Sequence, residues 1–347
     1  MKGRKPATRQ TVTLRDVARA AGVSVMTVSN FMNGKFQFMG KTTRQRVARA
    51  AERLDYRPSA NARGLRRAER RSIGMVVIDD QPAYLTDPFI TYVVAGLSNF
   101  LSSHGYALVL QGLSPRQLAA SPIVTDVLTD GICVMLSGSD AVRRTCLGQL
   151  LELRQPVVAF QEKPPRKQAD LCVICQDDRR GGELLGAHLT AKGAHRLAML
   201  VPHLIWPAIR EREAGIRRAI TATGADARLE FLDCGDVSMP ETQSALARYI
   251  KTHGLPDAVV AGNDQMGIAA LKLFREQGVA VPGRVLVTGF NAFEFWHYSD
   301  PLLTTVRSAA YEIGVKGGEA MVDRLQRGAF RERGIVLPVE LLLGGST

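Results

Sequence analysis

From residue 72 onward the chain contains short, continuous apolar runs separated by longer stretches with the period of a helix. The runs are, in chain order, SIGMVVID, YALVLQ, DGICVML, PVVAF, LCVIC, RLAMLV, AVVAG and RVLVTGF. A strand that is apolar at every position is covered on both faces, as in a parallel sheet between layers of helices. The pattern predicts an α/β fold built from βα repeats. Residues 73–347 are too many for one doubly wound sheet, so we expect two lobes.

The first 72 residues differ from the rest in charge. Of the 45 Lys and Arg and the 33 Asp and Glu in the chain, 18 and 4 lie in residues 1–72, which gives this part a net charge of +14. The rest holds 27 bases and 29 acids, a net charge of −2. A basic segment attached to a nearly neutral globular part indicates a module that binds a polyanion. Residues 1–12 are expected to be a disordered basic arm.

Three short helices are predicted after this arm, over Leu14–Ala20, Ser24–Met32 and Thr43–Leu54. Gly22 suits the turn between the first two helices, and Ser24 suits the N-cap of the second. The positions at which two crossing helices would bury side chains are all apolar: Val17, Ala21, Val23, Val28 and Phe31. This is the pattern of a helix-turn-helix. Its second helix is rich in Thr, Ser and Asn, which indicates a surface that meets hydrogen-bonding edges.

Membrane and metal sites are not expected. No apolar run approaches the length of a membrane span, and residues 1–10 contain no apolar stretch, so a cytoplasmic location is expected. Five cysteines fit a reducing compartment. Cys172 and Cys175 have C-x-x-C spacing, but in a strand their thiols point to opposite faces, which favours structural cysteines over a metal or redox site. Neither a cofactor nor a metal is expected.

Longer stretches of the sequence resemble the LacI family of bacterial transcription regulators. TLRDVARAAGVSVMTVSNFMN and TRQRVARAAERLDYRPSANARGLRR are similar to the family's headpiece and hinge. DRRGGELLGAHLTAKGAHRLAML, REAGI, AVVAGNDQMGIAALKLFREQGVAVPGRVLVTGF and PLLTTV continue the resemblance to the end of the chain.

The resemblance implies a multidomain protein. An all-α helix-turn-helix domain would cover residues 13–60, a hinge residues 61–72, and a two-lobed α/β core like the periplasmic binding proteins residues 73–347. The first lobe would comprise residues 73–173 and 306–331. The second would comprise residues 174–305 and 332–347.

The resemblance also implies which residues meet DNA. The second helix would lie in the major groove, with base contacts from Val25, Met26, Ser29 and Asn30. Phosphate contacts would come from Thr13, Thr27, Asn33 and Thr43. The hinge would become helical on DNA and place Leu65 in the minor groove as a wedge. Ala62, Arg63 and Arg66 would lie beside it.

A small effector would bind between the lobes. The resemblance points first to Arg212, Asn263 and Asn291, of which Asn291 stands where the family commonly has Asp. Because Asn carries no charge, a sugar acid is expected as well as a neutral sugar. Further candidates lie at strand ends or on aromatic segments: Asp87, Phe89, Ser137, Phe160 and Trp296. Trp206, Phe293 and Tyr298 could stack on an effector or belong to the core.

The leading hypothesis is therefore a repressor that binds palindromic operator DNA as a homodimer under control of an effector. The final LLLGGST has no heptad pattern, which favours a dimer over a tetramer. One alternative is a soluble sugar-binding receptor with a basic tail, which would need a signal peptide and no helix-turn-helix. Another is an α/β enzyme. G-x-G-x-x-G, Walker A and G-x-S-x-G motifs are absent, and the Ser of MLSGSD has no evident His partner.

Overall fold

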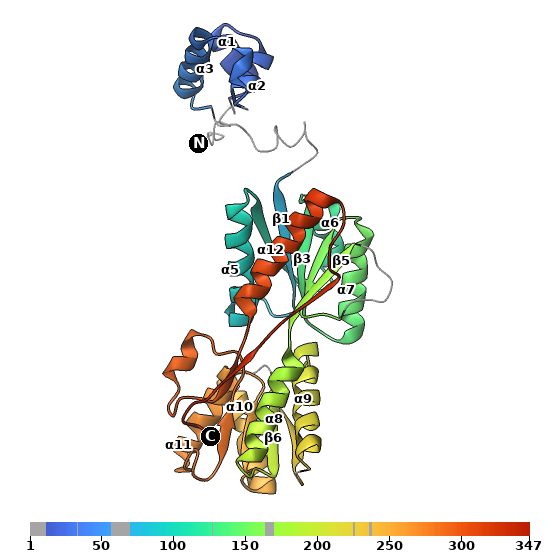
Figure 1. The fold of residues 1–347 in the computed structure, drawn as a ribbon, viewed down its shortest axis with the longest axis vertical. Coiled ribbons are helices and arrows are strands. Elements are labelled where there is room, and N and C mark those ends of the chain that lie inside the picture. The colour runs from blue at the N-terminus through green and yellow to red at the C-terminus, as the bar shows by residue number, and fades with distance from the viewer. Residues whose placement is uncertain are drawn as a thin grey trace, which may run out of the picture. The chain divides into compact units, whose positions relative to one another are not determined.

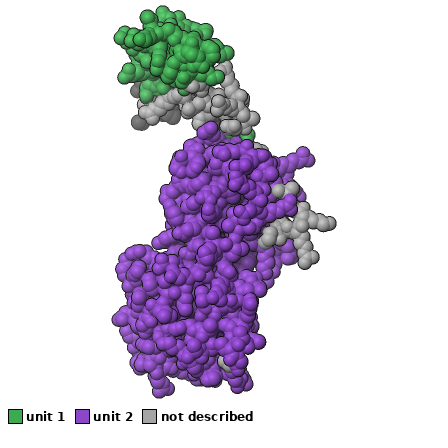
Figure 2. Space-filling view, in the orientation of Figure 1, with its two compact units in different colours: residues 1–70 green, residues 71–347 purple. Residues whose placement is uncertain are grey.

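The computed structural model describes residues 12–32, 34–56, 70–126, 128–163, 170–224, 226–235 and 238–347. The chain divides into two compact units, residues 1–70 and residues 71–347 (Figure 2). The predicted hinge residues Ala62, Arg63, Leu65 and Arg66 lie outside the described residues, as does Asn33. None of the helices formed by the described residues is both long and apolar enough to cross a membrane.

The described part of the first unit contains three helices and one short 3-10 turn: α1 (Leu14–Ala21), α2 (Val25–Met32), η1 (Phe36–Phe38) and α3 (Lys41–Arg53). The helices match those predicted, and η1 lies in the segment expected to be a loop. Their shared core is made of small and β-branched side chains: Val17, Ala18, Ala21, Val28, Val47 and Ala50. Gly22 turns the chain between α1 and α2 in the left-handed conformation, with φ 60°.

The second unit begins with a six-stranded parallel sheet, which forms the first lobe (Figure 1). The sheet order is β11-β5-β4-β3-β1-β2. Its strands are β1 (Ser72–Ile78), β2 (Ala107–Leu113), β3 (Gly131–Leu136), β4 (Val157–Phe160), β5 (Leu171–Gln176) and β11 (Gly334–Leu337).

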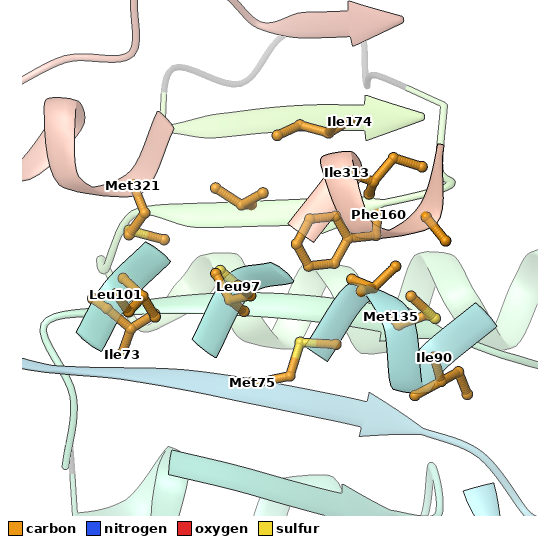
Figure 3. Close-up of a cluster of buried hydrophobic side chains, with 14 of the residues drawn as sticks. Ile73, Met75, Ile90, Leu97, Leu101, Met135, Phe160, Ile174, Ile313 and Met321 are labelled. Atoms are coloured by element: carbon orange, nitrogen blue, oxygen red, sulfur yellow. The ribbon is translucent and has the colours of Figure 1, made fainter. Parts of the chain in front are cut away.

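Helices cover both faces of this sheet. On one face, α5 (Pro88–Ser103) and α12 (Ala310–Arg327) pack on inward-facing residues such as Met75 and Phe160 (Figure 3). The other face is covered by α7 (Asp140–Glu152), α6 (Pro122–Thr125) and the turn η3 (Leu118–Ala120). The remaining short turn is η2 (Tyr84–Thr86).

A second, four-stranded parallel sheet forms the second lobe, in the order β7-β6-β8-β9. Its strands are β6 (Arg196–Val201), β7 (Arg228–Asp233), β8 (Ala258–Ala261) and β9 (Leu286–Thr288). Two helices pack on each face: α8 (Asp178–Ala191) with α9 (Pro207–Thr223), and α10 (Met239–His253) with α11 (Asp264–Glu276). The turn η4 (Glu294–Tyr298) follows β9. The two parallel sheets confirm the predicted fold class.

The chain passes between the lobes at three places: from β5 to α8, from β10 (Thr305–Arg307) to α12, and from β11 to β12 (Glu340–Leu342). β10 and β12 pair with each other in an antiparallel ribbon, with Val306 opposite Leu341. The expected division assigned residues 332–337 to the second lobe, but β11 pairs with β5 in the first sheet. The last passage therefore follows Leu337. The run GIVL is short and only half-buried, which hides this strand in the sequence.

Candidate DNA interface and effector cleft

Local hydrogen bonds fix where the second helix of the headpiece begins. The Thr27 amide donates to Ser24 Oγ at 3.0 Å, so Ser24 caps α2 as predicted. Ser24 Oγ also lies 2.9 Å from Thr27 Oγ1. The Thr27 hydroxyl thus hydrogen-bonds the capping side chain at the start of α2.

The exposed side of α2 carries three of the four residues predicted to contact bases. Val25 and Met26 are 39% and 57% exposed, and Asn30 is half-buried. Ser29 is only 5% exposed and lies beside buried Val28, so its side chain faces the headpiece interior. The structure thus corrects the assignment of Ser29 as a base contact. A small hydroxyl fits the close approach of two helices, and its polarity does not reveal this in the sequence.

Besides Thr27 at the start of α2, two predicted phosphate contacts lie at helix starts, Thr13 at α1 and Thr43 at α3. Thr13 Oγ1 accepts from the Asp16 amide at 3.4 Å, and the Thr13 amide donates to Asp16 Oδ2 at 2.9 Å, which closes a capping box on α1. Thr13 Oγ1 also donates to Asp16 Oδ2 at 2.6 Å. These bonds lower the pKa of Asp16. Thr43 is half-buried in the first turn of α3, whose N-cap Gly40 offers no side chain. The amides of that turn are therefore available to an anion.

The second unit holds a cleft between its lobes, lined by seven of the eight residues predicted to bind an effector. From the first lobe come Asp87, Phe89, Ser137 and Phe160, and from the second come Arg212, Asn263 and Asn291. Trp206, Gln161, Met135, Met266 and Ile209 also line it.

Trp296 does not line this cleft. Its ring packs against the core of the second lobe, and its Nε1 donates to the Leu303 carbonyl at 2.6 Å. Trp206, which precedes α9, does line it. Gln161 was not predicted, because a single Gln after a strand carries no recognisable signal. Its φ of 56° marks it in the structure.

Arg212 is the buried cation of the cleft and is held by several groups. It is 6% exposed, its Nε donates to Asp178 Oδ1 at 2.8 Å, and its Nη1 donates to the Gly262 carbonyl at 2.5 Å. The guanidinium also lies 3.5 Å from the centre of the Phe290 ring. Close packing of α9 on α8 fixes this position, since a Cβ on Gly182 would lie 2.0 Å from the Arg212 carbonyl oxygen.

Asp178 balances the charge of Arg212. It is 4% exposed at the start of α8 and accepts two further hydrogen bonds at 3.0 Å, from Gln176 Nε2 and Gln161 Nε2. Arg212 thus belongs to a buried, neutral cluster rather than presenting an uncompensated charge to the cleft.

Asn291 is the most unusual residue of the cleft. Its φ is 117°, in a region that favours glycine, and its buried Oδ1 has no hydrogen-bond partner among the residues that the structure describes. The next residue, Ala292, has φ 52°, and its amide donates to Asp264 Oδ2 at 2.6 Å. Asp264 also accepts from Thr305 Oγ1 at 2.5 Å. Burial raises the pKa of Asp264 to about 6.

The remaining polar residues of the cleft are engaged with their own lobes. Asp87 caps α5 by accepting from the Phe89 amide at 2.8 Å, and loss of water raises the pKa of its carboxyl. Ser137 Oγ donates to Asp79 Oδ2 at 2.7 Å. Asn263 Oδ1 caps α11 through the Met266 amide at 2.9 Å. By contrast, the buried Oδ1 of Asn291 finds no hydrogen-bond donor among the described residues.

Contacts across the cleft connect the lobes. Arg210 of α9 donates to Asp140 of α7 at 2.9 Å, and Lys163 lies 3.1 Å from Glu211. Tyr92 of α5 stacks on Phe293 of the second lobe, with 4.6 Å between ring centres. Within the described ranges no group of three or more His, Cys, Asp and Glu residues could hold a metal ion.

Comparison with known proteins places both units in known families. The sequence model described as bacterial regulatory proteins, lacI family, matches residues 13–59, and that of a periplasmic binding protein-like domain matches residues 187–347. The HTH-type transcriptional repressor PurR of Vibrio atlanticus (strain LGP32) is 30% identical over 317 residues, covering 90% of this chain and 92% of the relative.

Two solved structures share the fold over 97% of this chain. The transcriptional regulator CelR in complex with cellobiose is 25% identical with a TM-score of 0.70, covering 97% of this chain and 100% of that one. The lac repressor dimer bound to operator and the anti-inducer ONPF has a TM-score of 0.84 at 23% identity, covering 97% and 99%. The second of these shows the fold alone. Together with the helix-turn-helix and the two parallel sheets, the match to PurR shows that the chain belongs to the LacI family of bacterial regulatory proteins.

Proposed function

We propose that this protein is a transcriptional repressor that binds palindromic operator DNA as a homodimer and responds to a small effector held in the interlobe cleft. The PurR relative is named a transcriptional repressor, and the lac repressor is a dimer on its operator. In this chain, α2 supplies the helix for the major groove and the second unit supplies the cleft. The proposal includes a cytoplasmic location and no enzymatic activity.

The observation that carries the effector proposal is the buried, unpartnered Oδ1 of Asn291. A buried acceptor without a donor is costly, and a ligand N–H or O–H would satisfy it. The strained backbone at Asn291, with φ 117°, holds this oxygen in place before a ligand arrives.

The charges of the cleft favour a neutral effector. Because Asp178 already balances Arg212, an added carboxylate would find no free countercharge there. The residues that line the cleft are largely apolar or aromatic, with Phe89 and Trp206 among them. A neutral sugar, or another compact molecule with an apolar face and at least one donor, suits these walls better than the sugar acid that the sequence also allowed.

Thermal unfolding of the full-length protein against a panel of neutral sugars, sugar acids and nucleosides tests the effector proposal. A ligand at one hundred times its dissociation constant should add about 2.7 kcal/mol of stability. We expect the increase with a neutral compound, and we expect Asn291→Ala to abolish it. Asn99→Ala is the matched control, because Asn99 lies on α5 and bonds Tyr311 instead of lining the cleft.

The regulatory half of the proposal is tested with DNA. A duplex selected by the full-length protein from a random library should be bound less or more tightly when the same compound is present. A coupling of roughly 1–3 kcal/mol corresponds to about a 5- to 150-fold change in affinity. The proposal fails if no sequence is selected, or if a compound that stabilises the protein leaves DNA affinity unchanged.

A further inference from the structure

Phe38 is an exposed aromatic side chain that the headpiece fold does not explain. It lies in η1, between α2 and α3, and is 65% exposed. The other aromatic residue of this turn, Phe36, is less exposed at 37%. A large apolar side chain left in water on a small domain often marks an interaction surface.

The backbone of this turn is held in one geometry. Gly34 adopts φ 69°, and its amide donates to the Phe31 carbonyl at 3.1 Å. The Lys35 amide donates to the Asn30 carbonyl at 2.9 Å, which keeps the turn against the end of the recognition helix. Phe38 is therefore presented from a fixed turn that adjoins Asn30, a residue expected to contact bases.

The two aromatic residues of the turn have different surroundings. Phe36 packs edge-on against Phe31 with 5.8 Å between ring centres, and the Arg44 guanidinium lies 3.5 Å from the centre of its ring. These contacts give Phe36 a structural role. No aromatic or cation–π contact of this kind involves Phe38 within the described part of the headpiece.

The charge around the turn selects a polyanion as the partner. The sequence contains no Asp or Glu between Asp16 and Glu52. Lys35, Lys41 and Arg44 are all exposed on or next to the turn. The uncapped first turn of α3 adds open backbone amides at the same end. Basic side chains beside an exposed apolar one suit duplex DNA. There the basic side chains can bind phosphates, and the apolar side chain can pack on a thymine methyl group.

We propose that Phe38 packs on a thymine methyl group at the edge of each half-site, beyond the base pairs read by α2. The start of α3, with Lys41, holds the neighbouring phosphate and sets the distance. The DNA-reading surface of this protein thus extends from the recognition helix onto the turn that follows it. The inference rests on the proposed operator binding.

Replacing thymine by deoxyuridine, which removes only the methyl group, tests this contact. A duplex is first selected from a random library with the full-length wild-type protein. Each symmetric pair of thymines is then replaced in turn, and affinity is measured by fluorescence anisotropy. One buried methyl group corresponds to about a fourfold change in affinity, so replacement in both half-sites should weaken wild-type binding by roughly 16-fold at one position. Phe38→Ala should bind this duplex and the unmodified duplex equally well.

Two matched variants serve as controls. Gln37→Ala alters an exposed neighbour on the same turn and should keep the wild-type sensitivity to deoxyuridine. Phe38→Leu keeps an apolar side chain and should keep part of the wild-type sensitivity to deoxyuridine. Because Phe38 is exposed, Phe38→Ala should unfold at the wild-type temperature, which shows that the headpiece is intact.

The outcomes separate this inference from the proposed function. If the wild-type protein selects a site and Phe38→Ala retains the wild-type deoxyuridine profile, the contact is refuted while operator binding stands. If Phe38→Ala changes the sedimentation of the protein and leaves the profile unchanged, Phe38 meets a second copy of the chain and the inference is equally refuted. Failure of the wild-type protein to select any site would reject operator binding itself.

Discussion

Replacing Asp178 by Asn tests whether the buried ion pair with Arg212 organises the cleft. Asp178 is 4% exposed and accepts from three donors: Arg212 Nε, Gln176 Nε2 and Gln161 Nε2. Asn has nearly the same shape, but it brings donors of its own and removes the negative charge. At least one of the three donors would face another donor, and the Arg212 guanidinium would lose its buried counterion.

The expected cost follows from that uncompensated charge. Removing one partner of a buried pair costs about 3–5 kcal/mol, whereas an exposed pair is worth about 0–1 kcal/mol. At roughly 2 °C per kcal/mol for a large domain, the second unit should melt about 6–10 °C lower. Urea unfolding and calorimetry of the full-length protein measure both quantities. Arg212→Gln combined with Asp178→Asn should recover part of the loss, because no buried charge then remains.

Asp140→Asn is the matched control for this experiment. Asp140 also pairs with two arginines, Arg143 on its own helix and Arg210 across the cleft, but its side chain is 43% exposed. Its loss should cost no more than about 1 kcal/mol. If Asp178→Asn costs as little as Asp140→Asn, the buried cluster is not what holds Arg212, and the argument for a neutral effector loses its basis.

Three further predictions follow from individual contacts. Burial raises the pKa of Asp264 to about 6, so protonation of this carboxyl favours the folded state. The free energy of unfolding should therefore fall by roughly 3 kcal/mol as pH rises from about 4 through 6. Asp264→Asn should therefore flatten the change in urea-unfolding free energy over that range, and a slope equal to wild type would contradict the assignment. Ser24→Ala should lower the stability of the first unit by about 1 kcal/mol through loss of the α2 cap, as followed by circular dichroism on heating; no loss would mean that the cap contributes nothing. Gly215→Ala should lower the free energy of unfolding by about 3 kcal/mol, because the added Cβ would lie 2.0 Å from the Arg179 carbonyl oxygen. The Cβ added by Gly148→Ala meets no atom within 4 Å, so this variant should stabilise α7 by up to about 1 kcal/mol. Similar melting temperatures for these two variants would contradict the close packing of α8 on α9.

Most of the strands that the sequence predicted are buried, whereas β2 is an edge strand whose residues are only half-buried. Each of the eight apolar runs became part of a parallel strand, because continuous hydrophobicity reports burial directly. β7 was missed because RLEFLD mixes buried and exposed positions and is not continuously apolar. β11 and β12 were missed because they are short and half-exposed.

The resemblance to the LacI family, rather than residue chemistry alone, identified three candidate site residues. Asn263 caps α11, Asn291 follows β9 and Arg212 lies within α9, and all three line the cleft. Whether they bind an effector stays a prediction. Trp296 could not be separated from the core, because its ring packs on apolar residues while only its Nε1 needs a partner. Neither the charge balance by Asp178 nor the open Oδ1 of Asn291 can be seen without three-dimensional contacts.

The hydrogen bonds of the cleft show why ligand binding and lobe orientation belong together. Arg212 bonds Asp178, which also accepts from Gln176 at the end of β5, the first passage between the lobes. Gln176 Oε1 accepts from Ser308 Oγ at 2.7 Å, at the second passage. The Ser308 amide in turn donates to the Asn291 carbonyl at 3.0 Å.

Arg212 and Asn291, the two residues of the second lobe proposed to bind the effector, are thus connected through the segments that join the lobes. A ligand that satisfies Asn291 Oδ1 must fit the position that these bonds allow, and that position depends on how the passages are arranged. Binding free energy therefore differs between lobe orientations, which is the condition for a ligand to shift the population of one over another. A site wholly within one lobe could bind as tightly without any such difference, and it would leave the orientation of the lobes unchanged.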